Sequence, residues 1–262
     1  MIAKILEINL LKCYDKLVIV GLIFMSGHSH FAGIKHRKGI NDAKRAGIFT
    51  KIGRLITIAA RDGGGNPEFN FKLKMVIEQA RAANMPKDNI DKAIKRGTGE
   101  LKDGAEIQEM IYEAYGPGQI AMLIKTATDN KNRTVGEIKN ILIKSGGKLV
   151  SEGSVRFMFK QVGCIGIEIG NRNKDELEMK AIENGAEDIL CEDENFSIHT
   201  KVEDLKEVKD KLEKEGIKVE NAGLIYIATQ KIDISEEDKK NYEKLLEALD
   251  ELDDVQEVYD NL

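Results

Sequence analysis

Apolar residues recur at helical spacing between residues 41 and 61, where they form one stripe of Ile48, Ile52, Leu55, Ile56 and Ala59. At 100° per residue, four cations gather on the opposite side, namely Lys44, Lys51, Arg54 and Arg61. The pattern predicts a long helix with one buried face and one cationic face.

Two shorter helices are expected after this one. Asn66-Pro67-Glu68 supplies an N-cap residue, a proline at the first helical position and an acid in the first turn, which predicts a helix start there. A third helix follows Pro86, and Gly97 is its expected stop. Its basic positions are Lys92, Lys95 and Arg96. Residues 41–104 are therefore predicted to form a three-helix nucleic-acid-binding domain, preceded by a flexible basic arm at 25–40.

Beyond residue 105 the pattern changes to strands alternating with helices. The predicted order is ββαβ, with strands at 110–115, 120–128 and 155–169 and a helix at 133–144. The next stretch reads helix, strand, strand, helix, strand. A final helix is expected to begin at Ser235, and a closing strand is expected at 255–259.

The terminal helix and strand are expected to complete the first sheet. This gives one α/β domain from 105–170 plus 231–262, and a second, inserted α/β domain at 171–230. The predicted fold class is α+β, a three-helix domain followed by two split βαβ (ferredoxin-like) domains, one inserted in the other.

Charge is distributed very unevenly along the 262 residues, which carry a net charge of −5. Residues 25–102 hold 16 Lys and Arg against 7 Asp and Glu, whereas residues 103–262 hold 21 against 36. A basic end on an acidic body suggests that the N-terminal third faces a polyanion.

The basic arm concentrates this charge. Residues 27–39 contain three of the four histidines and a run of cations, which can contact phosphates and bases. The candidate nucleic-acid-binding residues are His28, His30, Lys35, His36, Arg37 and Lys38 in the arm, together with Lys44, Lys51, Arg54 and Arg61. Two other interpretations are a solvated terminus and a histidine metal site; no cysteine or carboxylate stands at ligand spacing to complete the latter.

No motif for catalysis stands out. The glycines at 63–65 and 97–99 lack the spacing of a phosphate loop, and no nucleophile with a base or carboxylate pair is evident. Asp129 or Asn130 is expected to cap the following helix, with phosphate binding by Arg133 as the alternative. The acidic C-terminal helix is expected to be a solvated face, with docking to a basic surface of a partner as the alternative. The sequence predicts no enzyme activity, no cofactor and no metal.

Three cysteines without paired spacing favour a reduced, cytoplasmic location. Residues 1–24 contain an apolar run too short to span a membrane, and they are expected to be an N-terminal extension before a functional start at Met25.

Several motifs resemble the YebC family, whose members are labelled probable transcriptional regulatory proteins and whose mitochondrial relatives activate translation of cytochrome c oxidase. They are GHSHFAGIKHRKG at 27–39, DAKRAGIFTKIGRLITIAAR at 42–61, AANMPKDNI at 82–90, YGPGQIA at 115–121, TDNKNRTV at 128–135 and GSVRFMF at 153–159. The chain departs from the usual pattern at His30-Phe31, Gly33 and Gln119, where the family has Lys-Trp, Asn and Gly.

The resemblance implies a helical domain followed by two α/β domains. It also implies a regulator of gene expression that binds DNA or RNA. The alternative function is a ribosome-associated translation factor that binds ribosomal RNA and relieves stalling at proline-rich stretches. Expected partners are nucleic acid and the ribosome or the transcription machinery, without a membrane. A protein-interaction module with a basic end is the other class considered.

Overall fold

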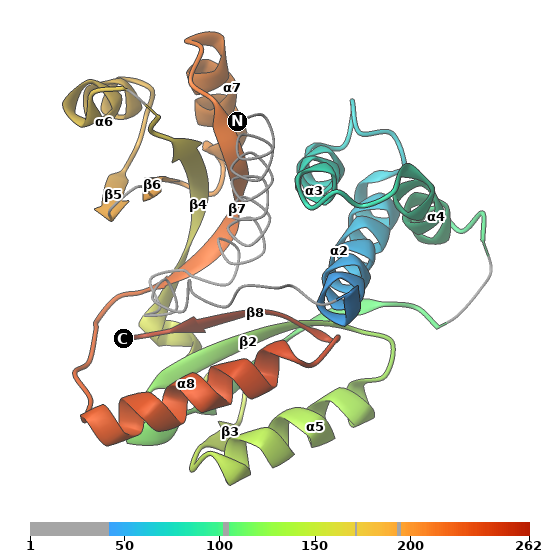
Figure 1. Ribbon diagram of the computed structural model, residues 1–262, viewed down its shortest axis with the longest axis vertical. Helices are drawn as coiled ribbons and strands as arrows, with labels where there is room; N and C mark the ends of the chain where they lie inside the picture. Colours follow the sequence, from blue (N-terminus) through green and yellow to red (C-terminus); the bar gives the residue numbers. More distant parts are fainter. Residues whose placement is uncertain (1–41, 102–104, 171, 193–194) are drawn as a thin grey trace, which may run out of the picture. The chain divides into compact units, whose positions relative to one another are not determined.

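The computed structural model describes residues 42–101, 105–170, 172–192 and 195–262, and the chain divides into two compact units. Unit 1 takes the chain up to Phe159 and again from Ala228 to Leu262. Unit 2 is the intervening segment, Lys160–Ile227, so one unit is inserted in the other (Figure 1).

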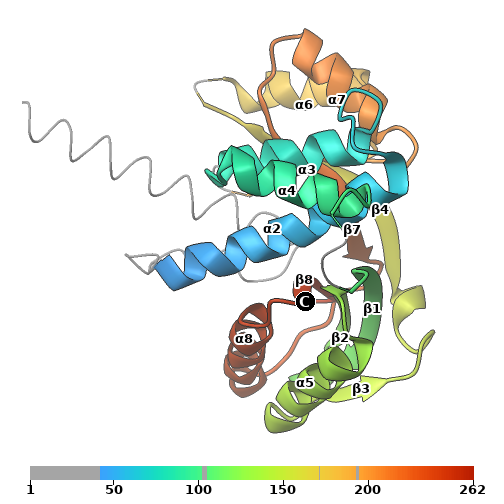
Figure 2. The ribbon, with the colours of Figure 1, turned by 90° about the vertical axis from the view of Figure 1, so that its right-hand side faces the viewer.

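Three helices form the first part of unit 1 (Figure 2): α2 (Asp42–Gly63), α3 (Phe71–Ala82) and α4 (Lys87–Gly97). The apolar stripe of α2 packs against the other two helices, as its spacing predicts. Ile56 and Ala59 of α2 and Leu73 and Ala80 of α3 are completely buried in this core. Gly97 ends α4 where its backbone crosses α2 so closely that a Cβ would lie 2.3 Å from the Thr57 carbonyl oxygen.

The second helix starts later than the sequence predicts, because Asn70 and not Asn66 is its N-cap. The Asn70 side chain accepts a hydrogen bond from the Leu73 amide at 3.0 Å, and it donates to the carbonyl oxygens of Ala59 and Gly64. The expected start at residues 66–68 is instead a turn whose hydrogen bonds return to the Asn66 carbonyl. A buried amide that satisfies three backbone groups outweighs the local preference of proline for the first helical turn.

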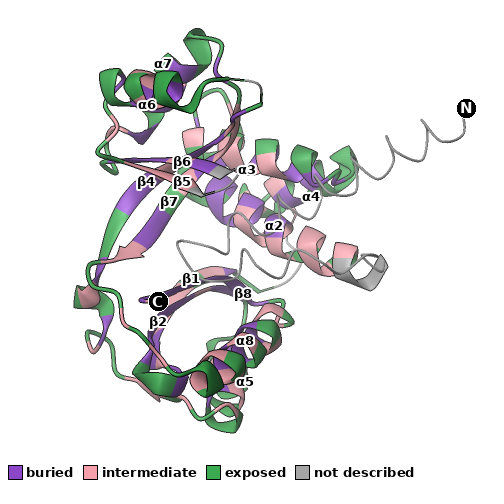
Figure 3. Cartoon of the chain, turned by 60° about the vertical axis from the view of Figure 1, so that its left-hand side comes forward, coloured by how far each residue is buried: buried purple, intermediate pink, exposed green. Residues whose placement is uncertain are grey.

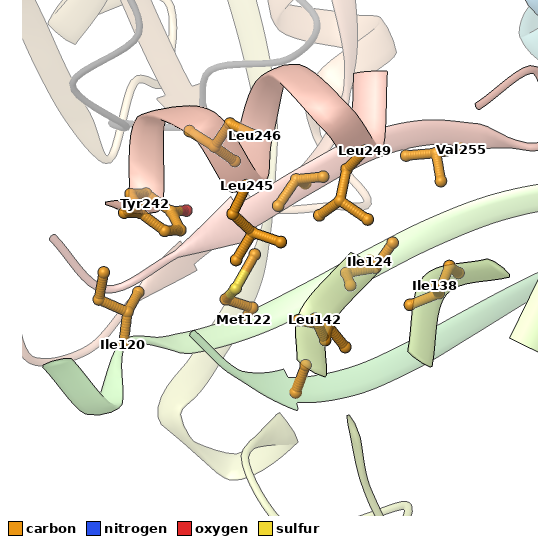
Figure 4. Packing of buried hydrophobic residues seen from close by; sticks show 12 residues of the cluster. Ile120, Met122, Ile124, Ile138, Leu142, Tyr242, Leu245, Leu246, Leu249 and Val255 are labelled. Atoms are coloured by element: carbon orange, nitrogen blue, oxygen red, sulfur yellow. The ribbon is translucent and has the colours of Figure 1, made fainter. Parts of the chain in front are cut away.

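The second part of unit 1 is a four-stranded antiparallel sheet in the order β3-β1-β2-β8. Its strands are β1 (Gln108–Tyr115), β2 (Ala121–Thr128), β3 (Lys148–Val150) and β8 (Val255–Asp260). The short helix η2 (Pro117–Gln119) joins the first two strands. Helices α5 (Lys131–Lys144) and α8 (Glu236–Asp250) cover one face, and Ser235 caps α8 as predicted. Figure 4 shows the core between them, in which Met122, Ile138 and Leu245 are fully buried.

Unit 2 has the order βαββαβ, with a second four-stranded sheet arranged β5-β6-β4-β7. Its elements are β4 (Phe159–Glu168), α6 (Lys174–Glu183), β5 (Asp188–Glu192), β6 (Asn195–Thr200), α7 (Leu205–Lys214) and β7 (Val219–Ala228). Each helix buries an apolar face and leaves charged residues exposed (Figure 3). This is the split βαβ arrangement.

The strand expected at 155–169 in the first sheet belongs to the second sheet. The first sheet takes β3 instead, a strand of three residues that the sequence pattern did not reveal. The chain leaves the first sheet through η3 (Arg156–Met158), and β4 then pairs with β6. The inserted unit therefore begins near residue 160 rather than at 171.

Replacement of Asn70 by alanine tests the importance of the cap. The variant loses one cap and two buried hydrogen bonds, so we expect the free energy of unfolding to fall by about 2–3 kcal/mol. Urea denaturation followed by circular dichroism measures the change. Asn66→Ala, which removes an exposed side chain, is the matched control and should cost less than about 1 kcal/mol. Equal effects of the two substitutions would contradict the assignment.

Candidate nucleic-acid interface

The arm residues His28, His30, Lys35, His36, Arg37 and Lys38 lie outside the described residues, as does the side chain of Lys44. The structure therefore bears on three of the predicted cations, Lys51, Arg54 and Arg61 in α2.

All three of these cations contact oxygen atoms of the α/β part of unit 1. The Lys51 ammonium donates to the backbone carbonyl and a carboxylate oxygen of Asp250, both at 2.7 Å. Arg61 donates to the Ile107 carbonyl at 2.5 Å and lies 3.1 Å from Glu106. The side chains of Lys51 and Arg54 are each only 16% exposed.

Asp254, in the turn between α8 and β8, is the centre of the contact. Its buried carboxylate accepts hydrogen bonds from Arg54, from Arg133 at 2.7 Å, and from the hydroxyls of Thr128 at 3.1 Å and Thr134 at 2.5 Å. Burial alone raises the pKa of this carboxyl, but the hydrogen bonds from Arg54, Thr134 and Arg133 outweigh burial and lower it to about 2. The group is therefore ionised at neutral pH.

This cluster explains the segment TDNKNRTV at 128–135. Asn130 caps α5 by accepting a hydrogen bond from the Arg133 amide, as the sequence predicts. The guanidinium of Arg133 pairs with the carboxylates of Asp254 and Asp129, and its side chain is 42% exposed. The segment thus holds Asp254, to which Arg54 of α2 also donates.

The cationic face predicted for α2 is therefore largely neutralised within the chain. Asp250 and Asp254, at the end of α8 and in the turn after it, contact this basic surface within the chain. A small apolar contact of Ile58, Ile107 and Ala127 reinforces the junction.

Exposed cations remain on α3 and α4. Within the described part of the chain, five exposed cations of these helices have no ion pair: Lys74, Arg81, Lys87, Lys92 and Lys95. In α4 the acid Asp88 lies in the first turn and the bases Lys95 and Arg96 lie in the last turn, an order that suits the helix dipole. The C-terminal end of α4 is thus the more cationic end.

The sequence pattern marked Lys92 and Lys95 as basic positions of the third helix but did not assign them to the interface, and it missed Lys74, Arg81 and Lys87. A helical projection of residues 87–97 would have found the two α4 lysines at exposed positions. Nothing in the local sequence indicates that α2, rather than α4, is neutralised, because the acids that pair with Lys51 and Arg54 lie about 200 residues away.

Other chemistries have little support in the described residues. No group of three or more His, Cys, Asp and Glu side chains there is arranged to hold a metal ion. Burial raises the pKa of the Cys164 thiol to about 12, so this cysteine is not a thiolate at neutral pH. No helix among the residues searched has the length and apolar character needed to cross a membrane.

The fold and the charge pattern define a three-part α+β protein with a cationic helical end. Residues 29–100 match the family description "TACO1/YebC protein N-terminal domain", and residues 107–262 match "TACO1/YebC second and third domain". The chain belongs to the TACO1/YebC family.

Relatives in this family are named probable transcriptional regulatory proteins. One from Persephonella marina is 48% identical over 239 residues, covering 90% of this chain and 95% of the relative. Another, from Thermotoga maritima, is 48% identical over 238 residues, with coverage of 90% and 93%. The crystal structure of a conserved hypothetical protein from Aquifex aeolicus superposes with a TM-score of 0.82 at 45% identity, covering 89% of this chain and 96% of that one.

Asp254→Asn tests the charge cluster. In the variant the buried guanidinium of Arg54 faces a neutral amide instead of a carboxylate. We therefore expect the free energy of unfolding to fall by roughly 3 kcal/mol at neutral pH. Because the folded pKa is about 2 and the unfolded pKa is near 4, the carboxylate contributes fully above about pH 5 and loses its contribution as the pH falls through 2. The difference in stability between wild type and variant should therefore narrow between pH 5 and pH 2.

Urea denaturation at a series of pH values measures this difference. Asp253→Asn, which changes the exposed neighbour, should lie within about 0.5 kcal/mol of wild type throughout. A difference for Asp254→Asn that does not vary with pH would show that its charge is not the stabilising feature.

Proposed function

We propose that this protein is a non-enzymatic, nucleic-acid-binding regulator of gene expression that acts in the cytoplasm. The arm and the exposed cations of α3 and α4 contact phosphates, and the acidic α/β units orient the protein or recruit another protein. The observation that carries the proposal is the set of five exposed cations without ion pairs on α3 and α4. These helices lie in the part of the chain that matches the N-terminal domain of the TACO1/YebC family, whose relatives are named probable transcriptional regulatory proteins.

RNA is the favoured ligand over duplex DNA. A helix that reads base edges in the major groove presents mainly Arg, Asn and Gln side chains. The exposed surface of α4 instead alternates lysines with Asp88 and Asp91, which suits phosphate contacts better than base-specific ones. Binding to ribosomal RNA as a translation factor is therefore the second candidate function, and the Gly- and His-containing arm suits an irregular RNA cavity.

Replacing Lys92 and Lys95 together with alanine tests the phosphate contacts. We expect weaker binding to RNA. The slope of log K against log salt should also be shallower by roughly 1.4 to 2, because binding releases fewer counterions when two phosphate contacts are lost. Fluorescence anisotropy with a labelled oligoribonucleotide at several salt concentrations measures both. Lys240→Ala with Lys244→Ala, which removes two exposed cations of α8, is the matched control. An unchanged slope in the first variant would contradict the proposed interface.

The choice between functions is tested by sedimentation with ribosomes. We expect the protein starting at Met25 to travel with ribosomes on a sucrose gradient, and the same protein without residues 25–40 to remain at the top. If both remain at the top, the translation-factor function loses its support, and binding to genomic DNA becomes the next property to measure.

A further inference from the structure

Phe157 is a large aromatic side chain placed in solvent. Its side chain is 75% exposed, although Val155 and Phe159 on either side of it are buried. The residue lies in η3, directly after the exposed Arg156. An exposed phenylalanine contributes nothing to the core, which leaves the face of its ring open to a ligand.

The backbone that carries this ring is held firmly. The buried Glu113 carboxylate accepts hydrogen bonds from the amides of Gly153, Val155 and Arg156 at 2.6, 2.6 and 3.0 Å. Burial raises the pKa of Glu113, but these three bonds outweigh it and hold the pKa below its usual range. On the other side, the Met158 carbonyl accepts from both the amide and the hydroxyl of Thr229. We call residues 151–158 the Phe157 loop.

The sequence that leads into the loop is locally basic, although it lies in the acidic part of the chain. Residues 139–157 contain four Lys and Arg against one Glu, whereas residues 103–262 as a whole contain 21 against 36. Lys148 in the adjacent strand β3 extends over the Tyr115 ring, 5.6 Å from its centre. A cationic region with an exposed aromatic ring is the combination that binds single-stranded nucleic acid.

We propose that the Phe157 loop is a second nucleic-acid contact, in which an unpaired base stacks on Phe157 while Arg156 and Lys148 contact the flanking phosphates. The inference rests on the proposed function and extends it to the α/β part of unit 1. Its ligand is single-stranded RNA, because the bases of a duplex are already stacked on their neighbours and cannot cover the ring. The fixed backbone favours binding because little of the loop has to become ordered.

The chain contains no tryptophan, which provides a direct test. In Phe157→Trp the new indole is the only one in the full-length protein. We expect its fluorescence to be quenched by a single-stranded oligouridylate and not by a duplex of equal length. Ile182→Trp, at a position of α6 that is 64% exposed, is the matched reporter and should not respond.

Affinity measurements separate this proposal from the proposed function. We expect Phe157→Ala to bind single-stranded RNA roughly tenfold more weakly, Phe157→Tyr to retain binding, and both to unfold at the temperature of wild type. One result would contradict this inference alone: wild type binds RNA through Lys92 and Lys95, Phe157→Ala binds equally well, and the fluorescence of Phe157→Trp does not change. In that case the ring would be a candidate contact for a protein partner. If wild type binds no nucleic acid, the proposed function fails and this inference fails with it.

Discussion

The buried carboxylate of Asp254 is the constraint on which unit 1 depends. A carboxylate removed from water is tolerated only when cations and donors replace its hydration. Here Arg54 comes from α2, and Arg133 and two threonine hydroxyls come from the strand and helix on either side of residue 130. The same group therefore fixes the end of α8, the start of α5 and the position of α2. Freeing Arg54 for a phosphate would leave Asp254 without that compensation, so these cations serve the fold.

The sequence predicted most of the fold because most of its signals are local. Apolar periodicity gave the helices of the first part, Gly97 gave the end of α4, and the Ser235 cap gave the start of α8. The failures have a common cause. The start of α3 depends on carbonyls at Ala59 and Gly64, and the exit from the first sheet depends on Glu113, which lies 40 residues before Gly153. Contacts between distant residues leave no periodic pattern in one sequence.

The candidate site shows the same limit more strongly. A helical projection correctly separates the apolar and charged sides of α2, but it cannot show what the charged side faces. In the structure, that side meets the end of α8 and the turn after it, and among the described residues of the helical part the exposed cations without ion pairs lie on α3 and α4. The division into a basic end and an acidic body is thus partly an internal matching of charges, and the sequence excess overstates the charge available for binding.

Two loops of unit 1 use the same device, which argues that their exposed rings are not accidents of packing. In each loop one buried polar side chain satisfies three backbone groups, Asn70 in the first and Glu113 in the second. Each loop then presents a phenylalanine to solvent, Phe69 at 86% exposure and Phe157 at 75%. Of the two, only Phe157 interrupts an acidic region with a local excess of cations, whereas Lys72 beside Phe69 lies near Asp62 and Glu109. The cations that flank Phe157 therefore stand apart from the acidic chain around them, whereas those near Phe69 are part of a generally basic domain.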